Sequence, residues 1–404
     1  MKRKIILVLC LVWLVRLNSG YAMPAGEPKL AAANNAFAFN LLRQIAKEQP
    51  AANIFISPYS AATVLQMVAN GAVGQTKTEM QQVLATKALP PDMVNAGAQA
   101  AAQSLNSLNN TNLILTTANS IWYQGGRPVN PDFLALNRQF FGSTIEPMDF
   151  ADPHAVDVIN AWANEKTRGR ISHLADGMID PQNTRMFLAN AVYFKGKWSD
   201  PFQPDDTKNR TFHLRGGGQK EIPMMTQSKT FTYRHGTGYQ AVRLPYEGEN
   251  LAMYVFLPET NSSLEHLLGI LNGDRWQRVT KPGFSEKDGT VVLPKFKLEY
   301  SVELAPPLQS LGMKLAFDRK QADFSGIASN LYVSAARQKT FVEVKEEGTE
   351  AAAVTAVMME LSTGPEPPRE HFDMIVDRPF VFLIEDNRTG MILFMGVMFD
   401  PATD

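Results

Sequence analysis

The sequence predicts an α+β fold built as a single large domain. Helical patterns and long strand-like runs both occur along the 404 residues. They do not alternate in the regular way that marks parallel α/β sheets. Apolar segments continue throughout the chain, and the stretches rich in Pro, Gly and Ser are too short to link separate domains. We therefore expect one core organised around a large sheet.

Five segments have the apolar spacing of helices that pack one face against a core. In the first of them, Leu30, Phe37 and Leu41 fall on one helical face. In the second, Ser57 precedes Pro58, the order expected of a helix N-cap followed by a proline in the first turn. The expected helices cover residues 29–48, 57–72, 76–84, 131–140 and 153–166.

Runs of apolar, β-branched and aromatic residues predict long strands between and after these helices. The runs cover residues 112–123, 185–195, 239–257, 289–300 and 340–345. Near the C-terminus, an apolar run that begins at 374 and another that ends at 398 flank a turn at 387–390. This arrangement predicts a β-hairpin.

The segment 345–363 carries the most informative pattern of the chain. Every second residue from Thr349 to Leu361 is uncharged, and the first four of these are small, whereas Glu350 and Glu360 belong to the other set. Because successive side chains of a strand point to opposite faces, the segment could enter a sheet with one uncharged face. Its glycine, alanines and following prolines are nevertheless unfavourable in a permanent strand. The pattern indicates a loop that can become a strand; a surface helix over 349–361 is the alternative.

Several segments, taken in order and at their spacing, resemble those of the serpin family. Serpins are protease inhibitors with an exposed reactive loop followed by such a hairpin. The matching segments are 53–60, 119–122, 159–171, 188–198, 316–326 and the C-terminal hairpin. The resemblance implies a serpin-like domain over 23–404, with a large central β-sheet, further sheets, about eight to nine helices and an exposed reactive loop at about 346–372.

The resemblance also implies where a protease would cut. Counted from Gly348 as the hinge glycine, the spacing usual in the family places the scissile bond between Ser362 and Thr363. Because the loop beyond this bond is long and rich in proline, Leu361 and Met359 stay open as alternatives for the residue that the protease accepts. The hinge that would insert comprises Glu346, Glu347, Gly348, Thr349, Glu350, Ala351, Ala352, Ala353, Val354 and Thr355.

A sheet-opening region is implied as well, and one of its members departs from the family pattern. Its residues are Ser57, Ser60, Asn190, Gln338, Trp198 and Lys295. Gln338 stands where the family often has a histidine; glutamine also donates and accepts hydrogen bonds, but it cannot become charged. We therefore expect a buried hydrogen-bond lock without a pH-sensitive opening. Lys295 is expected to pair with Glu346, and Trp198 reads equally well as an ordinary core aromatic.

The sequence lacks the motifs of the common catalytic and metal sites. The six histidines show no zinc-ligand spacing, no HExxH motif occurs, and there is neither a G-x-S-x-G elbow nor a phosphate-binding loop. We therefore expect no enzyme, no metal and no cofactor; an unrelated secreted enzyme is the least supported reading. A net charge of −1 without a basic cluster argues against a nucleic-acid partner and against a polyanion cofactor.

The N-terminus reads as a secretion signal over residues 1–22. A basic start, an apolar run over 5–15 and the small residues Gly20 and Ala22 fit a signal peptide cut after Ala22, with an uncleaved anchor as the alternative. Cys10, the only cysteine, lies within the apolar run, so the mature protein would have no disulfide. We expect a secreted or periplasmic protein, monomeric and without a membrane contact after cleavage.

Two functions fit these observations. The first is a suicide inhibitor of serine proteases, with papain-like cysteine proteases as further targets; the second is a non-inhibitory serpin-like carrier, chaperone or protease substrate. The uncharged hinge residues Thr349, Ala351 and Ala353 favour inhibition. Met359 and Leu361 favour elastase-, subtilisin- or chymotrypsin-like targets over trypsin-like ones, which require Lys or Arg.

Overall fold

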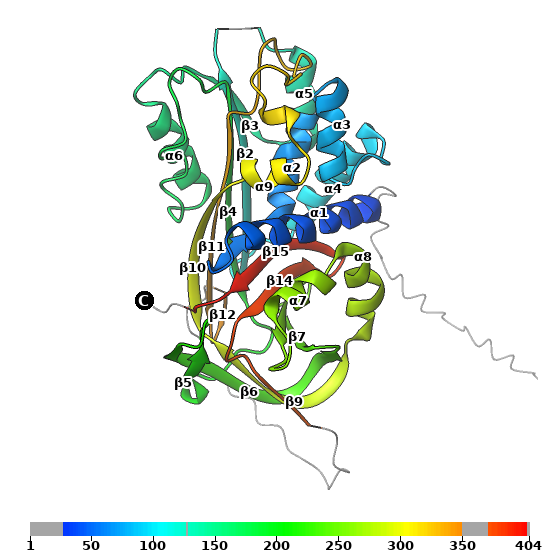
Figure 1. The fold of residues 1–404 in the computed structure, drawn as a ribbon, viewed down its shortest axis with the longest axis vertical. Helices are drawn as coiled ribbons and strands as arrows, with labels where there is room; N and C mark the ends of the chain where they lie inside the picture. The colour runs from blue at the N-terminus through cyan, green and yellow to red at the C-terminus, as the bar shows by residue number, and fades with distance from the viewer. Residues whose placement is uncertain (1–26, 127, 350–370, 402–404) are drawn as a thin grey trace, which may run out of the picture.

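Two β-sheets and the helices around them make up the computed structural model (Figure 1). The structure describes residues 27–126, 128–349 and 371–401. The predicted α+β class is confirmed, and nine α-helices occur in this part of the chain. Side chains from both sheets meet in one large hydrophobic core. The predicted signal peptide, residues 1–22, lies outside the described residues.

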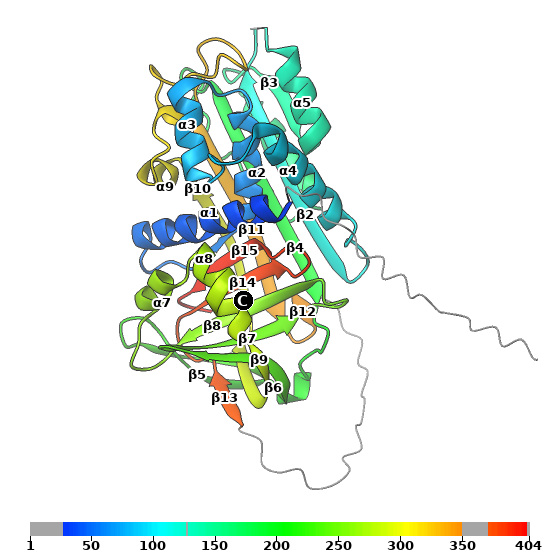
Figure 2. The ribbon, with the colours of Figure 1, turned by 90° about the vertical axis from the view of Figure 1, so that its right-hand side faces the viewer.

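The six-stranded sheet spans much of the long axis of the molecule (Figures 1 and 2). Its strands, in spatial order, are β10 (Phe296–Glu303), β11 (Ala335–Lys345), β12 (Gly348–Thr349), β4 (Met186–Lys197), β2 (Leu113–Gln124) and β3 (Thr144–Met148). Two contacts in this sheet are parallel, β11 with β4 and β2 with β3, and the other pairs are antiparallel.

The nine-stranded sheet lies in the lower half of the molecule as drawn in Figure 1. Its order is β1 (Ile54–Ile56), β15 (Met391–Met398), β14 (Phe380–Asp386), β8 (Leu251–Pro258), β7 (Tyr239–Pro245), β6 (Gln219–Gly236), β9 (Ser285–Pro294) and β13 (Phe372–Ile375), with β5 (Lys208–His213) on β6. The predicted C-terminal hairpin is confirmed as β14 and β15. The start of its first run is a separate strand, however, since β13 pairs in parallel with β9.

The helices gather mostly on one side of the six-stranded sheet (Figure 1). They are α1 (Glu27–Glu48), α2 (Pro58–Ala69), α3 (Gly74–Val83), α4 (Pro91–Asn106), α5 (Pro131–Phe141), α6 (Ala155–Lys166), α7 (Leu264–Ile270), α8 (Gly273–Arg275) and α9 (Ala305–Ser310). Short helical turns are η1 (Pro204–Asp206), η2 (Trp276–Thr280), η3 (Lys281–Gly283) and η4 (Leu315–Phe317). The five predicted helices are all present. No helix within the described ranges is long and apolar enough to cross a membrane.

Two helices cover opposite faces of the six-stranded sheet. Almost every residue of α2 is buried, and the helix touches β2 and β4 of this sheet as well as β15 of the other. On the other face, α6 packs through Trp162, whose ring meets that of Trp122 edge-on at 6.3 Å. Because side chains alternate along a strand, Ala189 and Ala191 of β4 face α6, while Asn190 between them faces α2.

Two predicted strand runs each divide into two strands. The run 239–257 breaks at a turn where Gly248 and Glu249 have positive φ angles of 79° and 57°, so β7 and β8 form a hairpin. The run 289–300 breaks at Lys295, where the chain passes from β9 in one sheet to β10 in the other. Helix α4 was not predicted, although its apolar and polar residues separate onto two faces as clearly as those of α5.

Candidate functional site

A short strand occupies one end of a slot between β11 and β4. In this strand, β12, Thr349 pairs with Val344 on one side and with Gly196 on the other, antiparallel to both. Farther along, β11 and β4 pair directly and in parallel over 335–341 and 187–193. We call the boundary between β11 and β4 the slot. At one end, which we call its head, β12 lies between the two strands; along the rest of the slot the two strands pair directly.

Gly348 lets the chain enter the head of the slot. Its φ angle is +148°, a value that residues with a side chain rarely adopt. A Cβ atom at this position would lie 2.2 Å from the carbonyl oxygen of Gly196 and 2.6 Å from the Cα atom of Lys197. Both neighbours are backbone atoms that cannot move aside, so any other residue here would displace β12.

Thr349 is fully buried and is held by a tyrosine. Its hydroxyl lies 2.9 Å from that of Tyr246, whose ring stacks on Trp198 at 4.6 Å. The Trp198 ring nitrogen donates to the carbonyl of Lys345 at 3.0 Å, and its backbone nitrogen donates to the carbonyl of Glu347, also at 3.0 Å. Trp198 therefore supports the turn between β11 and β12 and is more than a core aromatic.

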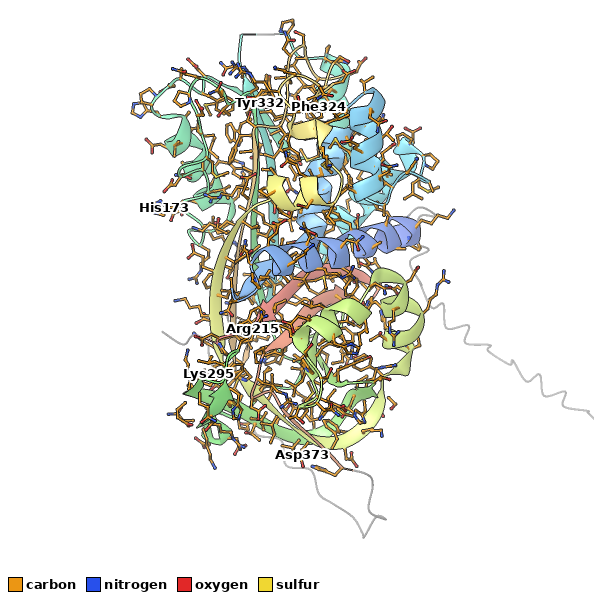
Figure 3. The ribbon with its side chains drawn as sticks, viewed as in Figure 1. His173, Arg215, Lys295, Phe324, Tyr332 and Asp373 are labelled. Carbon is orange, nitrogen blue, oxygen red and sulfur yellow. The ribbon has the colours of Figure 1, made fainter. Side chains whose placement is uncertain are left out.

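The expected ion pair of Lys295 and Glu346 lies beside this turn. The Lys295 ammonium is 2.9 Å from the carboxylate, and the Thr207 hydroxyl donates to the same group at 2.8 Å (Figure 3 labels Lys295 near β5). Burial raises the pKa of Glu346, but hydrogen bonds from Lys295 and Thr207 and the lysine charge lower it below its ordinary value. Because the pair is partly exposed, we assign it about 0–1 kcal/mol.

Below β12, a buried glutamine joins the two strands of the slot to α2. The Gln338 side-chain nitrogen donates to the carbonyl of Ser57 at 2.9 Å and to the side-chain oxygen of Asn190 at 2.5 Å. Its side-chain oxygen accepts from the Ser57 backbone N–H at 2.9 Å. Ser57 is also the N-cap of α2, as predicted, and its hydroxyl donates to the carbonyl of Leu393 in β15.

Two further residues extend this cluster to β2. The Asn190 side-chain nitrogen donates to the Ser60 hydroxyl at 2.5 Å and to the side-chain oxygen of Asn119. Ser60 donates to the same Asn119 oxygen at 3.2 Å. We call the five residues Ser57, Ser60, Asn119, Asn190 and Gln338 the polar lock. None of them is ionisable, so protonation cannot change the hydrogen bonds among them.

Asn119 and Tyr246 were missed as site residues by the sequence analysis. Asn119 stands opposite Asn190 in the antiparallel ladder of β2 and β4, so pairing the two predicted strands in register would have found it. Tyr246 carries no such signal: it follows β7 in the other sheet, far from the hinge in sequence, and only the folded chain brings it to Thr349.

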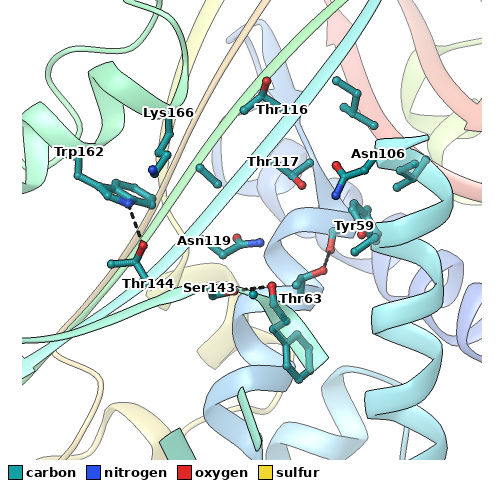
Figure 4. A pocket seen from close by; sticks show the side chains of 16 residues that line it. Tyr59, Thr63, Asn106, Thr116, Thr117, Asn119, Ser143, Thr144, Trp162 and Lys166 are labelled. Atoms are coloured by element: carbon teal, nitrogen blue, oxygen red, sulfur yellow. Dashed lines mark hydrogen bonds between the residues drawn. The ribbon is translucent and has the colours of Figure 1, made fainter. Parts of the chain in front are cut away.

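A cavity of about 270 Å³ lies beside the polar lock, between α2, α4, β2 and α6 (Figure 4). Asn119 lines it together with Thr63, Asn106, Thr117 and Trp162.

Most of the predicted hinge and the predicted scissile bond lie outside the described residues. These residues are Glu350, Ala351, Ala352, Ala353, Val354, Thr355, Met359, Leu361, Ser362 and Thr363. What the structure gives is the two attachments of the loop, β12 in one sheet and β13 in the other; Asp373 of β13 lies at the lower end in Figure 3. In the described ranges, no group of three or more His, Cys, Asp or Glu residues could hold a metal ion.

Comparison with known proteins decides the family. The sequence profile described as Serpin (serine protease inhibitor) matches residues 32–401. The chain belongs to the serpin family. An uncharacterized serpin-like protein of Thermococcus kodakarensis is 38% identical over 381 residues, covering 93% of this chain and 86% of the relative. Plasminogen activator inhibitor 1 of Bos taurus is 33% identical over 407 residues, covering 97% and 98%.

Solved serpin structures have the same fold. Native protease nexin-1, crystallised with heparin, superposes with a TM-score of 0.81 at 32% identity, covering 93% of this chain and 100% of the nexin chain. The native thermophilic serpin tengpin gives a TM-score of 0.83 at 29% identity, covering 92% and 94%. The predicted family and fold class are thus confirmed.

Replacing Gln338 by leucine should weaken the polar lock. The change leaves the Ser57 backbone N–H and the Asn190 oxygen buried without their partner, while the Ser57 carbonyl still accepts from the Ala61 N–H. We expect it to lower the free energy of unfolding by about 1–3 kcal/mol. It should also speed the annealing of a synthetic peptide of sequence 349–361 into the slot. Denaturant unfolding and native gels measure the two effects.

Gln66→Leu is the matched control, because Gln66 is also buried and donates to Asn34 away from the slot. It should lower stability without speeding peptide annealing. Equal annealing rates in the two variants would show that the polar lock does not hold the slot closed.

Proposed function

We propose that this serpin is a suicide inhibitor of serine proteases that inserts its cleaved loop as a strand into the slot. The observation that carries the proposal is β12: two hinge residues already pair antiparallel with both β11 and β4. Loop insertion by serpins is a form of strand addition, and the family description supports a serine protease as partner.

In the proposed reaction, the protease supplies every catalytic group. Its serine oxygen attacks the carbonyl of the scissile bond, an ester forms between that oxygen and the loop, and the amine on the Thr363 side leaves with a proton. Water would then hydrolyse the ester and release the protease. The inhibitor succeeds only when insertion moves the tethered protease before this hydrolysis.

Insertion would give the six-stranded sheet a more favourable set of hydrogen bonds. A strand that continues from β12 separates one parallel ladder and forms two antiparallel ladders, which are slightly more stable per residue. Each net hydrogen bond contributes about 1 kcal/mol, while ordering the loop costs about 1–2 kcal/mol per residue. Because these quantities are similar, one charge buried on the inward face would stop insertion. The sequence has none there from Thr349 to Leu361.

The remaining expectations belong to the same proposal. The accepted residue, at Ser362 or one of its alternatives Leu361 and Met359, suits an elastase-, subtilisin- or chymotrypsin-like target. We further propose that the chain is exported, loses residues 1–22 and acts as a monomer without a cofactor. A non-inhibitory serpin would share the fold but would be cleaved without retaining the protease.

The proposal predicts a covalent complex. Mixed with an elastase- or chymotrypsin-like protease, the protein should give a band that survives SDS, because the ester persists after insertion; its mass should be the sum of the two proteins less the released C-terminal fragment. Trypsin should form less of it. Thr349→Arg should abolish the complex while cleavage continues, since the site is buried against Tyr246 and cannot hold a charge.

Glu350→Arg is the matched control, because it adds the same side chain one residue along, in the set that already carries glutamate. It should leave trapping largely intact. Cleavage without complex by every protease tried would make the chain a substrate and favour the non-inhibitory reading.

The position of the scissile bond is a separate prediction. The fragment released from the complex should begin at Thr363, or at Ser362 if the loop is one residue shorter in register, because the prolines that follow Gly364 bind poorly in protease clefts. Mass spectrometry reads its mass directly. A fragment beginning at Glu370 would identify Arg369 as the accepted residue and overturn both the register and the inferred specificity.

A further inference from the structure

Tyr246 connects the hinge to a part of the molecule that does not belong to the slot. It follows β7 of the nine-stranded sheet, and its backbone N–H donates to the carbonyl of Leu251 at the start of β8. Its hydroxyl nevertheless reaches Thr349 at 2.9 Å in the six-stranded sheet. This contact therefore ties the head of the slot to the β7–β8 hairpin of the other sheet.

The tyrosine ring packs against two other aromatic rings. It is fully buried, stacks on Trp198 at 4.6 Å with planes 17° apart, and meets Phe194 edge-on at 5.1 Å. Gly196 makes room for it, because a Cβ atom there would lie 2.8 Å from the ring. Burial raises the pKa of the Tyr246 hydroxyl, although the bond with Thr349 lowers it, so the hydroxyl keeps its proton at neutral pH.

We propose that Tyr246 is a latch that seats Thr349 in the slot before any cleavage and thereby raises the fraction of encounters that end in trapping. The first half of the inference concerns the intact protein alone. The second half rests on the proposed function, since it concerns the competition between insertion and hydrolysis of the ester.

The physical reason is the cost of starting a strand. The first residue of an inserted strand must give up its backbone freedom before any neighbour in the same strand supports it. With Thr349 already seated, each later residue extends an existing ladder. Without the latch, Thr349 is seated for a smaller fraction of the time, so this first pairing more often has to form while water competes for the ester, and more inhibitor is cleaved and released.

Thr349 suits the latch better than a small residue without a hydroxyl. A threonine is compact enough for a fully buried site and still supplies a hydroxyl that either partner can use as donor or acceptor. Valine has nearly the same shape without the hydroxyl, so Thr349→Val separates the hydrogen bond from the packing. Tyr246→Phe does the same from the other side and keeps the ring contacts with Trp198 and Phe194.

The kinetic test compares Tyr246→Phe, Thr349→Val and the double variant with the unchanged protein. The readout is the ratio of cleaved to trapped inhibitor against an elastase- or chymotrypsin-like protease. Each single variant should raise this ratio roughly two- to tenfold, the size expected of one hydrogen bond. The rate of first attack on the loop should not fall. The double variant should add little, because both changes remove the same bond.

Tyr254→Phe is the matched control, since Tyr254 is also buried in the nine-stranded sheet and its hydroxyl lies near Arg243, not Thr349. It should change stability without changing the ratio. An unchanged ratio in Tyr246→Phe, or additive effects in the double variant, would overturn the kinetic half of the inference.

Hydrogen exchange of the intact protein tests the latch without any protease. The backbone amides of 344–349 should exchange faster in Tyr246→Phe than in the unchanged protein, and at the normal rate in Tyr254→Phe. Unaltered exchange in Tyr246→Phe would refute the latch itself. A protein that traps no protease would refute the proposed function, while the exchange rates would still decide whether Tyr246 seats Thr349.

Discussion

The direct parallel pairing of β4 with β11 is the contact on which the rest of this structure depends. Both strands sit in the middle of the six-stranded sheet, and their ladder ends where β12 begins. Parallel pairing is the less favourable of the two arrangements, and an antiparallel strand placed between them would replace it by two better ladders. On the proposed mechanism, the cleaved loop would supply that strand.

Side chains on one face keep this arrangement in place. The polar lock ties β4 and β11 to each other through Gln338 and Asn190, and both to α2 through Ser57 and Ser60. Opening the slot must break these bonds in a buried site, where unsatisfied polar groups are costly. The lock thus opposes spontaneous opening, while the ion pair and the Tyr246 contact hold the head of the slot, where the proposed insertion would begin.

Sequence reasoning found the parts of this site that local patterns encode. The N-cap at Ser57 follows from a serine before a proline, and Gln338 and the Lys295–Glu346 pair followed from family spacing. Asn119 and Tyr246 escaped because their roles depend on strands that meet only in the fold. The turn that interrupts the run 239–257 was not predicted, because Glu249 adopts a positive φ angle, which is uncommon for a glutamate.

The central claim is that the intact sheet lacks a strand that its own loop can supply, and thermal unfolding tests it most directly. The protein is cut once in its loop near residue 362 by a protease that it does not trap, and the midpoints of intact and cut protein are compared. Insertion predicts a much higher midpoint for the cut protein, since two antiparallel ladders replace one parallel ladder. An unchanged midpoint would show that the loop does not enter the slot and would contradict the account.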